Sequence, residues 1–343
     1  MILSLDDFIV NFSFKKEVLL IEKTEFISYP SGRTATLIND MMIYSSSIDK
    51  LVSNMKEVSH SIDVDMKSKE NSRRLIYTSK SSKSETSITI QIEDITEMTD
   101  ISRKLFNIAL MKMTNGTVSK GQLAKDYVSI SLKELVDGGF YKTIESARKG
   151  FKRSAKCLVR QISFQGTIVN YKKKVIQEDF EVMFTGYHIK NNIGYLSLNP
   201  KVNYEFLFLT YTKVPYFEYM SLSVRTGDLL IYIMTLARQK QNTAKIINNA
   251  PFNISVRAVA HKLGLPSYSD TKNPGRDIIG KIESSVNDIL STVSSRCISI
   301  EIRGIGCHAS SRDTYDNGYL QIALKNEYRD YFSSLYERNS KEE

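Results

Sequence analysis

The chain has few cysteines and no long apolar segment, and each shortage excludes a class of protein. Its three cysteines are scattered over 343 residues and form no Cys-x-x-Cys pair, so we expect reduced thiols rather than a disulfide framework. No run of about 18 apolar residues occurs, which argues against a membrane-spanning helix. The first residues, MILSLDD, turn acidic where a signal peptide would be basic and then apolar. These features predict a cytoplasmic protein.

The sequence also lacks a catalytic or metal-binding pattern. The four histidines are too far apart for the His-x-His metal site of a rolling-circle nuclease. Residues 275–281, GRDIIGK, resemble a P-loop, but Ile282 stands where magnesium needs Ser or Thr. Favourable charge at a helix N-terminus explains the acidic residues between Glu93 and Asp100 better than metal-dependent hydrolysis. We therefore expect no enzyme activity, no cofactor and no metal site.

The net charge is positive and concentrated in one segment. Lys and Arg number 47 against 38 Asp and Glu, a formal net charge of +9. Residues 141–176 contain ten basic residues and one acid, Glu145, so this segment accounts for the whole excess. Such a segment indicates an anionic partner, which is nucleic acid or a membrane surface. A solvated helix face without a partner is the alternative that the sequence leaves open.

The first region of the chain, residues 1–95, reads as an extension of mixed helix and strand. Short strands are expected at residues 18–21 and 25–29, and a long helix at residues 34–58. Residues 60–86 are polar and rich in Ser and Lys, which predicts a mobile connector.

The second region, residues 96–200, has the element order of a winged helix-turn-helix. A helix and a short strand lead to a basic helix, and a hairpin with a basic tip follows. The expected elements are a helix capped by Asp100 and ending at Asn115-Gly116, a strand at 128–132, a helical turn at 133–136, a helix capped by Thr143, and strands at 161–170 and 180–189 joined through residues 171–174.

The third region, residues 201–343, repeats that order without repeating the sequence. The expected elements are a helix at 223–240, a strand at 253–256, a helix at 257–263, a turn at 264–266, a long helix at 274–293, strands at 297–303 and 319–324, and a last helix near 327–336. The sequence therefore predicts an α+β protein with two tandem winged helix-turn-helix domains and an N-terminal α/β extension.

Several short motifs occur in order through the second and third regions. They are SISLKEL at 129–135, YLSLNP at 195–200, FL at 208–209, YMSL at 219–222, LLIY at 229–232, ISVR at 254–257 and HKLGLP at 261–266. Together with the Lys- and Arg-rich helix after the first motif, they resemble the plasmid replication initiators that carry two winged helices and bind iterons. The resemblance covers about residues 96–324. The N-terminal extension and Gly227-Asp228 within the long helix depart from that family.

The resemblance implies a sequence-specific double-stranded DNA-binding protein that binds repeated origin sites and promotes origin opening. It implies origin repeats and host replication proteins as partners, it leaves a homodimer open, and it implies no membrane partner. Two alternatives remain, a double winged-helix transcriptional regulator and a basic interaction protein without DNA readout. Two modules in one chain favour the initiator, because a simple repressor has one module and dimerises.

The candidate DNA contacts form two sets. Lysines of the first module are expected to balance phosphate charge, and Arg148 or Arg153 could contact guanine with two hydrogen bonds. The second set is less charged and better suited to base edges, with Arg276 as the best candidate for a guanine contact. The candidates are Lys142, Thr143, Ser146, Arg148, Lys149, Lys152, Arg153, Lys156, Lys172, Lys173 and Lys174 in the first module, and Lys272, Asn273, Arg276, Lys281 and Ser284 in the second.

Overall fold

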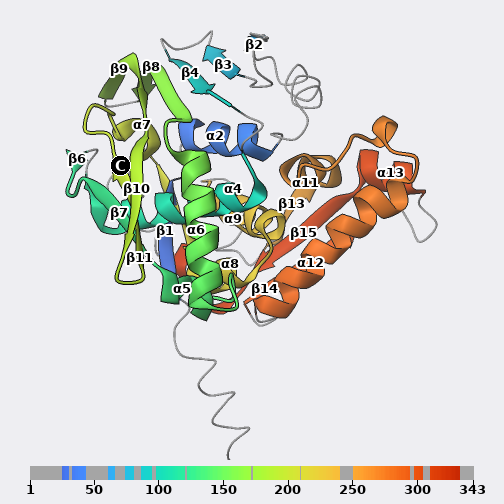
Figure 1. Ribbon diagram of the computed structural model, residues 1–343. Coiled ribbons are helices and arrows are strands. Elements are labelled where there is room, and N and C mark those ends of the chain that lie inside the picture. The colour runs from blue at the N-terminus through green and yellow to red at the C-terminus, as the bar shows by residue number, and fades with distance from the viewer. Residues whose placement is uncertain are drawn as a thin grey trace, which may run out of the picture.

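The chain forms an α+β fold of small antiparallel sheets with helices packed on them (Figure 1). This agrees with the fold class expected from the sequence. No helix in the described part of the chain is long and apolar enough to cross a membrane. The computed structural model describes residues 25–30, 33–43, 61–65, 74–80, 86–94, 98–119, 122–170, 173–208, 210–239, 250–293, 297–303 and 310–332. The strand expected at 18–21 and residues 44–58 of the helix expected at 34–58 lie outside these ranges.

The first unit, residues 100–198, is a three-stranded sheet with helices on one face. Its first helix is capped by Thr99, whose hydroxyl accepts from the Ser102 N–H at 3.2 Å, and not by Asp100 as expected. The sheet order is β10-β11-β7. The elements are α4 (Asp100–Lys112), β7 (Tyr127–Ser131), α5 (Leu132–Asp137), α6 (Ile144–Leu158), β10 (Phe184–Lys190) and β11 (Ile193–Leu198).

The second unit, residues 224–324, has the same order of elements and the same sheet topology. In each unit the last strand lies between the first and the middle strand, here as β13-β15-β14. The elements are α9 (Val224–Arg238), β13 (Phe252–Ser255), α11 (Val256–Lys262), η4 (Gly275–Ile279) running into α12 (Gly280–Thr292), β14 (Ile298–Arg303), α13 (Ser311–Asn317) and β15 (Tyr319–Leu324). The expected order of elements in the third region is confirmed, and α13 is an addition to it.

One expected hairpin belongs to a different sheet. The strands β8 (Ile162–Asn170) and β9 (Lys173–Val182) pair with each other, but β8 also pairs with β4 (Ser87–Ile92). The five-stranded sheet β2-β3-β4-β8-β9 results, with β2 (Ser61–Asp65) and β3 (Arg74–Lys80) at its far side. The expected strand at 180–189 was wrong, because that range spans the end of β9 and most of β10.

The expected connector at 60–86 was also wrong, since β2 and β3 lie in this range. Strand pairing satisfies backbone groups whatever the polarity of the side chains, so a Ser- and Lys-rich segment can still join a sheet. Here β3 pairs with β4, whose Ile88, Ile90 and Ile92 are fully buried.

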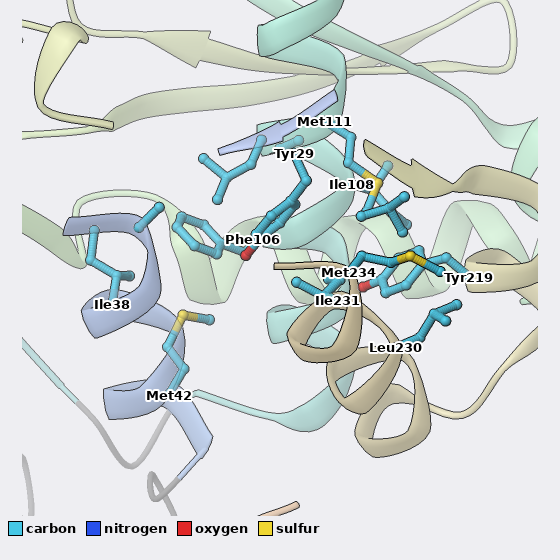
Figure 2. Close-up of a cluster of buried hydrophobic side chains, with 14 of the residues drawn as sticks. Tyr29, Ile38, Met42, Phe106, Ile108, Met111, Tyr219, Leu230, Ile231 and Met234 are labelled. Carbon is cyan, nitrogen blue, oxygen red and sulfur yellow. The ribbon is translucent and has the colours of Figure 1, made fainter. Parts of the chain in front are cut away.

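The described N-terminal residues are built into the core instead of forming an appendage. The strand β1 (Phe26–Pro30) pairs with β12 (Tyr211–Pro215), and α2 (Arg33–Ile43) packs against α4 and α7 (Glu205–Phe208). Figure 2 shows side chains from these parts meeting in one cluster with α8 (Tyr216–Ser221) and α9. The labelled residues are Tyr29, Ile38, Met42, Phe106, Ile108, Met111, Tyr219, Leu230, Ile231 and Met234. Short elements complete the fold: η2 (Met113–Thr117), β5 (Val118–Ser119), β6 (Gln122–Leu123) and η3 (Tyr268–Asp270).

A buried polar network crosses this cluster. Arg103 Nε of α4 lies 2.8 Å from Asp228 Oδ2 of α9, and each side chain is only 2% exposed. Asn107 donates to the other Asp228 oxygen at 2.9 Å and accepts from the Tyr29 hydroxyl at 3.0 Å. Burial raises the pKa of Asp228, and the Arg103 charge opposes that shift. The network ties β1, α4 and α9 together through hydrogen bonds and one ion pair.

The network explains the Gly227-Asp228 pair that departs from a regular apolar helix. Asp228 supplies the carboxylate that Arg103 needs, and Gly227 makes room for an aromatic ring. A Cβ at Gly227 would lie 2.8 Å from a ring carbon of Tyr219. Both residues therefore serve the packing of α9 against its neighbours.

Lys104 is a second buried cation in the same core. Its ammonium donates to the carbonyl oxygens of Met220, at 2.9 Å, and Leu222, which lie at the end of α8. It also lies 4.7 Å from the centre of the Phe140 ring. Burial lowers the pKa of Lys104 to about 8, against the opposing influence of Asp228.

Lys104 should make the stability of the protein depend on pH. Because its pKa falls from 10.5 to about 8 on folding, the unfolded chain binds more protons between these values, and stability rises with pH. Urea unfolding should show the wild-type protein gaining about 2 kcal/mol over Lys104→Met when the pH is raised from about 7.5 to about 9.5. Lys149→Met, which changes an exposed lysine, serves as the control. Parallel pH curves for wild type and Lys104→Met would contradict the prediction.

Candidate nucleic-acid interface

The helix α6 presents one basic face to solvent. Thr143 caps it in a reciprocal arrangement with Ser146, in which each backbone N–H donates to the other side chain at 3.1 Å. Phe151 and Leu158 are among the residues buried on the opposite face. The structure therefore brings together six predicted cations, all exposed: Lys142, Arg148, Lys149, Lys152, Arg153 and Lys156. The side chains of Thr143 and Ser146, which were also predicted as DNA contacts, form the hydrogen bonds of this cap.

Two glycines allow the close packing that positions α6. A Cβ at Gly194 of β11 would lie 2.5 Å from the Phe151 ring, and a Cβ at Gly150 would lie 2.1 Å from the Tyr141 hydroxyl. Any larger residue at either position would push the helix from the sheet or displace the ring. These tight contacts with Phe151 and Tyr141 fix the orientation of α6 and therefore the direction in which its basic face points.

The turn between β10 and β11 lies beside α6, and this hairpin was not predicted from the sequence. Arg148 donates to Asn192 Oδ1 at 2.6 Å, and Lys190 next to the turn is exposed. Asn191 and Asn192 have φ values of 51° and 59°, as a two-residue type I′ hairpin requires. The Asn-Asn pair between two alternating segments is a signal that could have identified this hairpin.

The lysines expected on the wing of the first unit lie on the other hairpin. Lys174 is exposed on β9, Lys173 begins that strand, and Lys172 lies outside the described residues. In Figure 1 the β8–β9 hairpin extends toward the top of the view, whereas the β10–β11 hairpin reaches toward the bottom. The hairpin expected as the wing of the first unit, with Lys173 and Lys174, therefore belongs to the five-stranded sheet, because β8 pairs with β4 and not with β7. The contact of these lysines with DNA stays a prediction.

Local polar contacts stabilise the N-terminal end of η4–α12 in the second unit. Asp277 accepts from the Thr271 hydroxyl at 2.6 Å and from Arg276 Nε at 3.0 Å. These two hydrogen bonds, first that of Thr271, lower the pKa of Asp277. The Arg276 side chain remains 77% exposed. The other predicted contacts of this unit are exposed as well: Lys272, Asn273, Lys281 and Ser284.

The helix α13, inserted between β14 and β15, adds the cation Arg312 near the N-terminal end of η4–α12. Neither this helix nor the role of Arg312 was predicted from the sequence. The helix packs against η4 and α11, and a Cβ at Gly275 would lie 3.0 Å from its Ser311 hydroxyl. Its Arg312 guanidinium lies 5.4 Å from the Tyr268 ring centre and 3.3 Å from Asp316. The Ser310-x-x-Asp313 capping box was the available sequence signal for α13.

The described residues offer no cluster of three or more His, Cys, Asp or Glu side chains placed to bind a metal ion. Residues 275–281, the P-loop-like segment, form η4 and the start of α12.

Gly194→Ala should destabilise the first unit, because the new methyl group would meet the Phe151 ring at 2.5 Å. Such overpacking costs about 1–3 kcal/mol, measurable by urea unfolding. The matched control is Gly186→Ala in the same hairpin, where the nearest atom to a Cβ lies 3.7 Å away and little change is expected. Equal stability of the two variants would show that α6 is not packed as described.

Comparison of the chain with protein-family models, with curated proteins and with solved structures found no match. A functional assignment therefore depends on the residues and the geometry described above.

Proposed function

We propose that this protein binds duplex DNA sequence-specifically through two winged helix-turn-helix units and initiates replication at repeated origin sites. The observation that carries the proposal is the repeated topology: helix, strand, helix, helix and hairpin, with sheets ordered β7-β11-β10 and β13-β15-β14. In helix-turn-helix proteins the second helix of the pair enters the major groove. The corresponding helices are α6 and η4–α12, which Figure 1 shows at the front of the molecule.

The first unit supplies affinity. The cations of α6 lie on one exposed face, and the face contains a single acid, Glu145. Glu145 pairs with Lys149 at 2.7 Å, but both side chains are at least 75% exposed, so this ion pair is weak and gives way to phosphate. The Asn191-Asn192 turn takes the place of the wing beside the helix.

The second unit supplies specificity. Arg276 contacts Asp277 through Nε at 3.0 Å, and its side chain is 77% exposed, so DNA can reach the guanidinium. Asn273 and Lys281 extend the same exposed surface, and Arg312 of α13 lies next to it. This set can make bidentate and single hydrogen bonds to base edges.

The two units are joined by buried contacts, which favours one site read by one chain. Besides the Arg103–Asp228 ion pair, Lys262 of α11 contacts both carboxylate oxygens of Asp40 in α2, at 2.6 and 2.8 Å. These side chains are at most 17% exposed. A chain that holds two recognition helices in fixed relation can bind successive grooves of one repeat without dimerising.

The basic face of α6 should set the salt dependence of DNA binding. Replacing Lys149, Lys152, Arg153 and Lys156 with Ala removes four proposed phosphate contacts, so affinity for any duplex should fall. The slope of log K against log salt should decrease by roughly 0.9 for each lost contact, in titrations followed by fluorescence anisotropy. Lys173→Ala/Lys174→Ala, on the other hairpin, should leave the slope near the wild-type value. An unchanged slope in the α6 variant would mean that this face is only solvated.

Arg276→Ala should weaken binding to a specific site by about tenfold to a hundredfold and barely change binding to scrambled DNA. The specific probe is duplex from the flanks of the gene for this protein, chosen for direct repeats of about two helical turns. Arg303→Ala, an exposed arginine on β14, is the control. Equal losses on specific and scrambled probes would remove Arg276 from base readout. Support of plasmid replication in vivo separates an initiator from a regulator, which would only repress transcription.

A further inference from the structure

The sheet of the first unit has a second face that the duplex-binding proposal does not use. The helices α4 and α6 pack on one face, where Val128, Ile130 and Leu196 are buried. Since side chains alternate along a strand, the intervening residues of β7, β10 and β11 point to solvent. Figure 1 shows this sheet at the left of the molecule, with the helices to its right.

Three aromatic rings form a row across this solvent-facing side. Tyr195 of β11 pairs in register with His188 of β10, and their rings are stacked at 4.6 Å with an interplanar angle of 10°. The Tyr127 ring of β7 meets Tyr195 edge to face at 5.2 Å. Tyr127 is 39% exposed, and His188 is also exposed. The row is therefore formed before any ligand binds, with one end at an open sheet edge.

The surroundings of the row suit a polyanion with flat bases. Lys190 follows His188 on the same side of β10 and is exposed. The other solvent-facing positions in register with the rings hold glycine, serine and Ile193, with no carboxylate among them. Apart from the three rings and Ile193, these positions carry no large apolar side chain, whereas the buried centre of a protein interface is more apolar than the rest of the surface. Stacking on aromatic rings combined with a nearby cation is how proteins hold single strands.

We propose that this face binds single-stranded nucleic acid, with one base stacked on the outer side of the His188 ring. His188 lies on β10, the edge strand of the sheet, so a base can extend the His188–Tyr195 stack without meeting another strand. The adjoining phosphate then lies against Lys190. The site is separate from the cations of α6, because α6 packs on the other face of the sheet.

The test measures binding of the full chain to labelled oligothymidylate, oligouridylate and an abasic strand of equal length by fluorescence anisotropy. Salt is kept high enough to suppress purely ionic binding. Wild type should bind the base-containing strands more tightly than the abasic strand. His188→Ala should lose about fivefold to a hundredfold on the base-containing strands and nothing on the abasic one. The comparison of thymidylate with uridylate then shows whether DNA or RNA is preferred.

Two variants keep the result interpretable. His188→Phe preserves a flat ring and should retain binding, whereas Phe217→Ala removes a ring that is 50% exposed on α8 and should change nothing. The variant lacking the four α6 cations should keep its preference for bases over the abasic strand, so that failure of the duplex proposal is distinguishable from failure of this one. Equal binding of abasic and base-containing strands would overturn the proposal. So would an unaffected His188→Ala variant or the absence of single-strand binding.

Discussion

The arrangement of the whole molecule depends on the ion pair between Arg103 and Asp228. Two charges that are almost completely buried are costly, and replacing Arg103 would leave the buried Asp228 carboxylate without its cation. Asn107 donates to the other carboxylate oxygen and accepts in turn from the Tyr29 hydroxyl, so the network is connected through β1, α4 and α9. Because α4 begins the first unit and α9 begins the second, the two units share one core at this point.

The same constraint determines how the functional surfaces are presented. The helices α4 and α9 meet at the polar network. The ion pair between Lys262 and Asp40 connects α11 of the second unit to the N-terminal helix α2. The helix α6 packs on α4 and the helix α12 packs on α9, and both turn charged or polar faces to solvent. A fold of this kind sets the spacing of the two proposed recognition helices through packed side chains. The strand β1 and the helix α2 are part of that connection.

The helical part of the site could be predicted from local sequence to a large extent. Thr143 was recognised as a cap, and the apolar spacing of Phe151, Ala155 and Leu158 identified the buried side of α6. In the second unit the spacing of Ile278, Ile282, Val286 and Ile289 did the same for η4–α12. A helix satisfies its backbone within itself, so caps and a periodicity of 3.6 residues carry most of the needed information.

Strand partners and buried charges could not be predicted in this way. The sequence by itself determined the longer helices of the two units, their basic and polar faces, and the repeated order of elements. Only the tertiary structure decided that β8 pairs with β4, that the Asn191-Asn192 turn lies beside α6, and that residues 61–65 and 74–80 are strands. It also decided that Asp228 is paired in the core. The physical reason is that a strand completes its hydrogen bonds, and a buried carboxylate finds its cation, on segments far away in the chain, and no local pattern specifies which segments these are.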